Sequence, residues 1–121
     1  MITPCVSEDD FRRMLADSAH GPVLLLKHST SCPISAAARR AYVQFADTMP
    51  EVACREVLVI EQRPLSRQIA EETGVAHQSP QVILFVNGQP VWHASHWNIT
   101  IEALRLAYSD AQKNVSIQST D

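Results

Sequence analysis

One cysteine stands where an apolar run gives way to a segment patterned as a helix. The run Val23–Leu26 is followed, a few residues later, by the pentapeptide SCPIS at positions 31–35. The residue before a proline is biased away from the helical region, and proline suits the first position of a helix. The sequence therefore predicts that a buried strand leads into a helix that Cys32 caps and Pro33 begins.

A thiol in this position is chemically activated. The first turn of a helix carries unpaired N–H groups and the positive end of the helix dipole. Both favour the thiolate of Cys32, which is the reactive form in thiol–disulfide exchange. A small apolar cysteine that fills a helix start is the alternative, but Ser31 and Pro33 make a poor setting for a core position. We therefore expect an accessible, reactive thiol.

The whole chain has the composition of one globular domain. Its 121 residues are enough to bury a core without disulfide bonds, and the balance of 45% apolar and 19% charged residues is ordinary. The net charge of -3 gives no electrostatic footprint for nucleic acid or an anionic membrane. No apolar stretch approaches the length of a membrane span. We expect neither nucleic acid nor a membrane as a partner.

The cysteine count favours a reducing compartment. Three cysteines, at positions 5, 32 and 54, do not form the disulfide framework of a secreted domain, and the start MITPC lacks the features of a secretory signal. A cytoplasmic protein is expected, in which a single exposed thiol is more often reactive than structural. Cys54 lies among apolar strand residues and is predicted to be buried. Cys5 is placed in a mobile stretch before the first helix.

Apolar periodicity predicts four helices and four strands in the order α-β-α-β-α-β-β-α. Asn87-Gly88 between two apolar runs is a strong hairpin signal. Residues 1–111 are assigned to the domain and residues 112–121 to a polar, flexible tail. The first helix follows Ser7 and stops before Gly21-Pro22, the second spans 33–48, the third runs from 64 to 72 and the fourth follows Asn98 or Thr100; the strands are 23–27, 52–60, 81–86 and 90–94.

This order of elements predicts an α/β fold of thioredoxin type. The first β-α-β unit gives two parallel strands with a right-handed crossover. The closing hairpin adds antiparallel strands, so that a mixed four-stranded sheet is flanked by helices and preceded by an N-terminal helix. Ser79-Pro80 stands just before the third strand, where proline cannot join a central ladder. The thioredoxin fold places a cis proline there, facing the redox thiol, and we predict a cis Ser79-Pro80 bond.

Three segments carry a resemblance to a known family. They are HSTSCPIS at 28–35, HQSPQ at 77–81 and WHASHWNIT at 92–100. With them the chain resembles the monothiol bacilliredoxins, thioredoxin-like proteins of the bacillithiol system, over roughly residues 7–110. The resemblance implies reduction of mixed disulfides between proteins and bacillithiol. It implies bacillithiol as co-substrate, S-bacillithiolated proteins as partners and no permanently bound cofactor.

Ser35 stands where dithiol thioredoxins have a second cysteine. A hydroxyl cannot form a disulfide bond, so the predicted cycle uses Cys32 alone and a second small thiol or another redoxin clears it. Two roles are open for the Ser35 hydroxyl. It is either a hydrogen-bond donor to the Cys32 thiolate, which makes it part of the catalytic pair, or a simple serine on the helix surface.

In this fold the segment before the cis proline and the loop that enters the last helix flank the active thiol. The backbone of Ser79 can pair with an extended ligand like an edge strand, and the helix start near Asn98 offers N–H groups to an anion. Bacillithiol carries carboxylates. Trp92 is expected to pack, and Lys27 and Arg39 are expected to be solvated surface charges. The expected substrate-binding residues are Pro33, Ile34, Ser79, Pro80, His96, Trp97 and Asn98.

Other functions are weighed against this one. His28, His93 and His96 could be imagined around zinc, but strand and loop geometry does not bring them together, and no metal site is expected. His28 is instead expected to tune Cys32 or to bind the loop. An iron–sulfur carrier like the monothiol glutaredoxins is a rival, although their motif is Cys-Gly-Phe-Ser and this chain has Pro33-Ile34. A non-catalytic thioredoxin-like adaptor is the second rival. A monomer or weak dimer is expected.

Overall fold

The computed structural model describes the backbone of residues 1–120 and the side chains of residues 1–113. Strands and helices alternate from β1 to β4, and a hairpin, a short 3-10 turn and a helix complete the chain. The strands are β1 (Ile2–Pro4), β2 (Val23–His28), β3 (Ala53–Leu58), β4 (Gln81–Val86) and β5 (Gln89–Ser95). The helices are α1 (Glu8–Asp17), α2 (Pro33–Thr48), α3 (Arg63–Thr73), the 3-10 turn η1 (His96–Asn98) and α4 (Ile101–Thr120).

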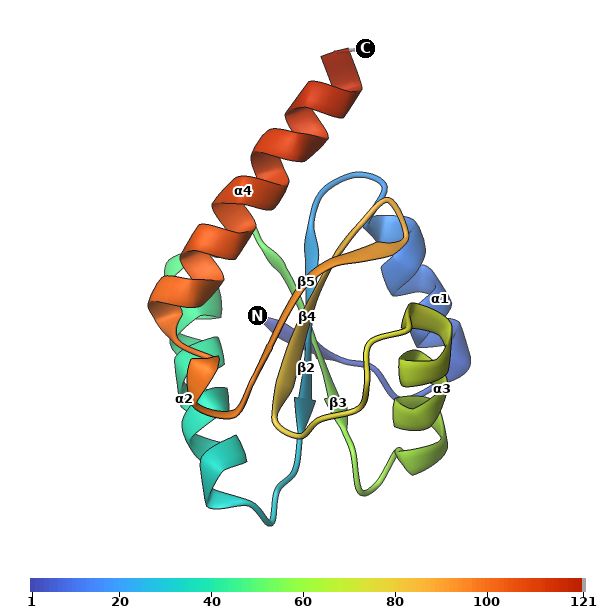
Figure 1. The fold of residues 1–121 in the computed structure, drawn as a ribbon, viewed down its shortest axis with the longest axis vertical. Coiled ribbons are helices and arrows are strands. Elements are labelled where there is room, and N and C mark those ends of the chain that lie inside the picture. Colours follow the sequence, from blue (N-terminus) through green and yellow to red (C-terminus); the bar gives the residue numbers. More distant parts are fainter. Residues whose placement is uncertain (121) are drawn as a thin grey trace.

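The strands form one mixed sheet in the order β1-β3-β2-β4-β5. The strands β1, β3 and β2 are parallel, whereas β4 pairs antiparallel with both β2 and β5. Helices α2 and α4 cover one face of the sheet, and α1 and α3 cover the other (Figure 1). The predicted α/β fold of thioredoxin type is therefore confirmed.

The central strands β2 and β4 are buried along their whole length. Because successive side chains of a strand point to opposite faces, β2 contributes to two apolar layers. Leu24 and Leu26 pack with α2 and α4, whereas Val23 and Leu25 pack with α1 and α3. Both layers therefore hold the strand that leads to Cys32.

The prediction of four strands is wrong by one. Strand β1 pairs with β3, with Ile2 opposite Cys54. Three residues are too few to show a strand period, and Pro4 is tolerated because β1 lies at the sheet edge. The same pairing overturns the prediction of a mobile stretch around Cys5. Its N–H donates to the carbonyl oxygen of Glu56 at 2.7 Å, and its side chain is buried.

The remaining boundaries agree with the prediction to within a few residues, and α2 and β4 agree at both ends. Thr100 rather than Asn98 caps α4, since its Oγ1 accepts a hydrogen bond from the N–H of Ala103 at 3.1 Å. The described backbone of α4 is helical through Thr120. The flexibility predicted for residues 112–121 stays a prediction, and residue 121 lies outside the described residues.

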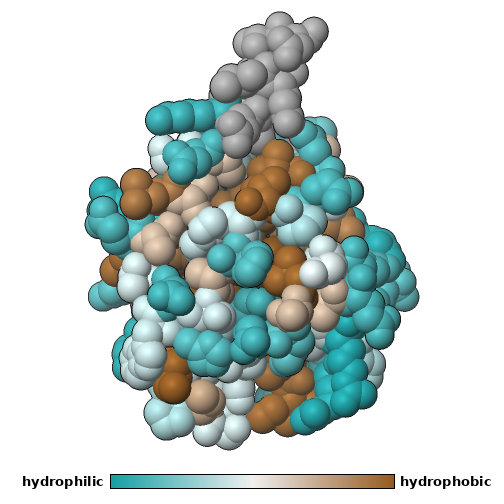
Figure 2. Space-filling view, in the orientation of Figure 1, coloured by the Kyte–Doolittle hydropathy of each residue, from teal (hydrophilic) through white to brown (hydrophobic). Residues whose placement is uncertain are grey.

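The surface offers no obvious broad apolar area in the orientation of Figure 2, where apolar side chains lie in small patches among polar ones. Within the described part of the chain, no helix has both the length and the apolar character that crossing a membrane requires. The large apolar side chains that are exposed belong to separate parts of the chain and include Val6, Ile60, Val91, Trp97 and Leu106.

Tyr42 ties α2 to the sheet. Its side chain is fully buried, and the single hydrogen of its hydroxyl is shared between the carbonyl oxygens of Leu24 at 3.0 Å and Arg55 at 2.8 Å. The same oxygen accepts from the N–H of Arg55 at 3.2 Å. One hydroxyl thus links the helix that carries Cys32 to both β2 and β3.

We predict that Tyr42→Phe lowers the free energy of unfolding by about 1–2 kcal/mol, because buried polar groups of the backbone lose a partner. The measurement is urea unfolding followed by circular dichroism. Tyr108→Phe is the matched control, since the Tyr108 hydroxyl has no hydrogen bond to a described residue and a smaller change is expected. Equal losses in the two variants would contradict a special role for the Tyr42 hydroxyl.

Candidate active site

Cys32 occupies the position predicted for it. It is the N-cap of α2, with extended backbone angles (φ -114°, ψ 121°), and Pro33 lies in the first turn. Its carbonyl oxygen accepts the N–H of Ala36 at 3.0 Å, as an N-cap carbonyl does. The side chain is partly exposed and makes no capping hydrogen bond. The thiol therefore belongs to a partly exposed residue at the positive end of a 16-residue helix that has no acidic residue in its first turn.

The peptide bond between Ser79 and Pro80 is cis, as predicted. Because Gln81 pairs with Lys27, this bond lies beside the end of β2, at the sheet edge from which the chain turns toward Cys32. The carbonyl oxygen of Pro80 accepts the N–H of His96 at 3.1 Å. This hydrogen bond ties the cis-proline segment to η1, which itself contacts α2.

The residues expected to bind substrate are therefore spread over three neighbouring segments. Pro33 is exposed and Ile34 is partly buried at the start of α2, and Ser79 is partly buried before the buried Pro80. The Ser79 hydroxyl is buried without a hydrogen-bond partner among the described atoms. The remaining three residues form η1: His96 with φ 55°, Trp97 with 70% of its surface exposed, and the exposed Asn98.

Ser35 is not on the helix surface, so that interpretation is wrong. Its side chain is fully buried. Its Oγ accepts the N–H of Ser29 at 2.9 Å and lies 2.7 Å from Nδ1 of His28. Among the described residues, no hydrogen bond joins Ser35 to Cys32. Ser35 therefore fastens the first turn of α2 to the end of β2 and to the loop between them.

His28 is the buried partner in this arrangement. Burial is the main reason that its pKa is lowered, which keeps the ring neutral near pH 7. Its carbonyl oxygen also accepts the N–H of Val59, at 2.9 Å, so its backbone is fixed by the residue that follows β3 while its ring holds Ser35. Of the two roles expected for His28, the structure shows neither directly: its ring bonds to Ser35 in the first turn of α2, and Ser35 in turn bonds to the loop residue Ser29. Spacing in the sequence gave no signal that these two side chains would meet.

The prediction that Lys27 is a solvated surface charge is wrong. Its side chain is fully buried, and Nζ donates to the carbonyl oxygen of Ser66 at 3.2 Å and to Nδ1 of His77 at 3.1 Å. Burial lowers the pKa of Lys27 to about 8. Arg39 is partly exposed, but it is paired with Glu56 at 2.6 Å.

The other two thiols are separated from Cys32 by burial. Cys5 packs in the layer with α1 and α3, and burial raises its pKa to about 11. Cys54 packs in the layer with α2 and α4, as predicted for a structural thiol, and burial raises its pKa as well. Both effects disfavour the thiolate that would resolve a mixed disulfide on Cys32. Trp92 packs partly buried against the core, as predicted.

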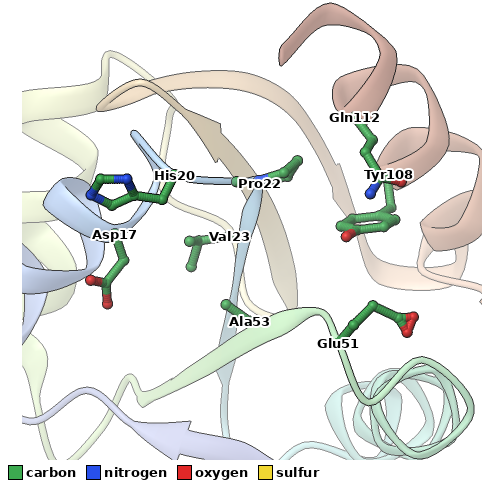
Figure 3. A pocket seen from close by; sticks show the side chains of 9 residues that line it. Asp17, His20, Pro22, Val23, Glu51, Ala53, Tyr108 and Gln112 are labelled. Atoms are coloured by element: carbon green, nitrogen blue, oxygen red, sulfur yellow. The ribbon is translucent and has the colours of Figure 1, made fainter. Parts of the chain in front are cut away.

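Among the described residues no group of three or more histidine, cysteine or acidic side chains could hold a metal ion. A cavity of about 460 Å³ lies at the opposite end of β2 from Cys32, since its lining includes Val23, the first residue of that strand. In Figure 3 its polar side chains come from both sides, with Asp17 and His20 near α1 and Tyr108 on α4, and do not converge on one point. This cavity is separate from the thiol.

Comparison with known proteins agrees with this geometry. Residues 4–104 match the family described as monothiol bacilliredoxin BrxC. A solved structure described as a candidate oxidoreductase with a thioredoxin fold is 35% identical, has a TM-score of 0.81, and the match covers 88% of this chain and 92% of that one.

Solved thioredoxins are more distant. The protein from Fasciola hepatica is 15% identical with a TM-score of 0.73, and 90% of this chain and 98% of that chain are covered. The thioredoxin from Malassezia sympodialis is 21% identical with a TM-score of 0.73, over 93% of this chain and 91% of that one. These two likenesses show the fold alone. The match over residues 4–104 shows that the chain belongs to the monothiol bacilliredoxin family, as a thiol-disulfide oxidoreductase with a thioredoxin fold.

Proposed function

We propose that the chain reduces mixed disulfides between proteins and bacillithiol, with Cys32 as the nucleophile. The observation that carries the proposal is the contrast among the three cysteines: Cys32 is partly exposed at a helix N-terminus, whereas Cys5 and Cys54 are buried. Ser35, which occupies the place of a second active cysteine, is buried and bonded to His28. Membership of the bacilliredoxin family supports bacillithiol as the small thiol.

The proposed cycle has two exchange steps. The Cys32 thiolate attacks the bacillithiol sulfur, the disulfide bond to the client protein breaks, and the client leaves as a thiolate that takes up a proton. A new disulfide then joins bacillithiol to Cys32. A second thiolate, from bacillithiol or another redoxin, attacks the bacillithiol sulfur and releases Cys32 as a thiolate. The client is reduced, and the second thiol is oxidised.

The ligand is proposed to lie between the cis-proline segment and η1. The backbone of Ser79 pairs with the extended ligand, Pro33 and Ile34 flank the reacting sulfur, and the exposed Trp97 covers it on the side of η1. His96 and Asn98 supply polar contacts from the same turn. No permanently bound cofactor is proposed. A cytoplasmic setting and a monomer or weak dimer complete the proposal. The large apolar side chains that are exposed belong to separate parts of the chain, which is consistent with weak self-association.

The direct test is incubation of the reduced chain with a bacillithiolated client, followed by intact-mass measurement. We expect a gain of one bacillithiol on Cys32 and release of the reduced client. Cys32→Ser should lose all transfer while its circular dichroism and melting stay close to wild type, because serine also suits an N-cap. Cys5→Ala is the control that should retain transfer. Turnover by Cys32→Ser would move the chemistry to another residue.

A second prediction concerns Ser35→Cys. The new thiol stands one helical turn after Cys32, so mild oxidation should join the two in an internal disulfide and the variant should act as a dithiol thioredoxin. Mass spectrometry should show the loss of two hydrogen atoms and of two alkylatable thiols. Ser35→Ala, which cannot form this bond, is the matched control. Two free thiols in oxidised Ser35→Cys would refute the expectation.

Alkylation distinguishes the enzyme from a non-catalytic adaptor. Under native conditions iodoacetamide should modify Cys32 first. A rise in the Cys5 pKa from 9.0 to about 11 alone reduces its thiolate about a hundredfold, and burial slows it further. Peptide mapping at several times and pH values measures the three rates. An alkylation rate for Cys32 that follows pH as a free small thiol does would favour the adaptor.

A further inference from the structure

A cavity of about 230 Å³ on the α3 side of the sheet is lined by basic groups. Its walls are formed by Val59, Arg63, Ser66, Arg67 and His77, and none of these is acidic. Arg63 and Arg67 stand four residues apart on α3, so they share one face of the helix and repel each other. Neither forms an ion pair with another described residue. An anion between them would remove this repulsion.

A third cation stands behind the cavity wall. The ammonium group of Lys27 is fully buried and donates to the Ser66 carbonyl and to the His77 ring, two residues that line the cavity. No carboxylate of the described residues lies within ion-pairing distance of it. A buried charge without a counter-charge is costly, and an anion in the cavity would stabilise it.

The pKa of the His77 ring reflects the same charge distribution. Its pKa is lowered first by burial and then by the charges of Lys27, Arg63 and Arg67. All three cations therefore act on the space around one ring. Because Nδ1 accepts from Lys27, a neutral ring carries its proton on Nε2, which is then a hydrogen-bond donor. The net charge of the whole chain is -3, so this basic cluster is a local feature.

The cavity lies at the end of the sheet where β2 and β3 finish, which is also the end at which the chain turns toward Cys32. Lys27 is the penultimate residue of β2, and Val59 follows the end of β3 and donates its N–H to the carbonyl of His28. His77 belongs to the segment that leads to the cis Pro80. Figure 1 shows that α3 begins at the edge where β2 and β3 end, on the face opposite α2. The cis-proline segment therefore connects this cavity, through His77, with η1, through the Pro80 carbonyl that accepts the N–H of His96.

We propose that this cavity binds the carboxylates of the small thiol that Cys32 exchanges. The proposal rests on the proposed function, in which that thiol is bacillithiol. Two arginines and a histidine N–H that line the cavity match a small dicarboxylate, since charge-assisted hydrogen bonds from arginine are the strong ones. The Lys27 charge behind the wall adds electrostatic attraction without contacting the ligand. The same chemistry could be met by an acidic side chain of the client protein, and the experiment separates these two sources.

The kinetic test compares one neutral peptide carrying either bacillithiol or cysteamine, a thiol without carboxylates, in a mixed disulfide. Arg67→Gln should raise KM for the bacillithiol peptide roughly tenfold and leave kcat and the cysteamine reaction unchanged. Arg67 is exposed, so the variant should fold. Arg13→Gln, an exposed arginine of α1, is the control without effect. Equal losses on both peptides overturn the proposal. The measurement is repeated with an acidic peptide in place of the neutral one. If Arg67→Gln raises KM only for the acidic peptide, the proposal is also overturned and the cavity is assigned to the client.

A binding measurement separates this proposal from the proposed function. L-malate should shift the ring signals of His77 in a two-dimensional NMR spectrum of the intact chain, with the signals assigned through His77→Gln, and Arg67→Gln should abolish the shift. Absence of any shift in the wild type overturns the cavity even if bacillithiol transfer occurs. A shift without any transfer of bacillithiol retains the carboxylate cavity and overturns the proposed function instead.

Discussion

The bond between His28 and Ser35 is the constraint on which the site depends. His28 ends a strand that is buried on both faces, and Ser35 lies in the first turn of α2, so one hydrogen bond of 2.7 Å fixes the strand end against the helix start. The N–H of Ser29 completes the arrangement at the loop entrance. The four residues between β2 and α2 therefore have both ends held. Cys32 stays partly exposed although its supports on either side are buried.

Two consecutive residues of β2 serve the two faces of the sheet. His28 points to the face of α2 and holds the helix that carries the thiol, whereas Lys27 points to the face of α3 and contacts the walls of the basic cavity. The alternation of side chains along a strand makes this division unavoidable. The reacting sulfur and the proposed anion site therefore share a strand end without competing for the same space.

Much of this architecture could be predicted because strong local signals mark it. Proline after Cys32 and helical spacing from Pro33 predict α2 at both ends, and Asn87-Gly88, both with positive φ, predict the hairpin. Strand β1 could not be predicted because three residues show no period. The burial of Lys27 could not be predicted because it depends on contacts with α3 and with the segment around His77, which are far away in the sequence. Local patterns fix elements, whereas the partners of a polar side chain at a strand end come from tertiary packing.

The burial of Ser35, Cys5 and Cys54 has a consequence for how the small thiol is held on Cys32. Cys5 lies in one apolar layer and Cys54 in the other, so neither reaches Cys32 without disrupting a core. In the proposed cycle a mixed disulfide on Cys32 must therefore wait for an outside thiol, with the small thiol attached throughout that interval. A dithiol enzyme expels its substrate quickly and gains little from holding it. A monothiol enzyme gains from contacts that bind the attached thiol in one orientation, because they leave its sulfur aligned for the second attack.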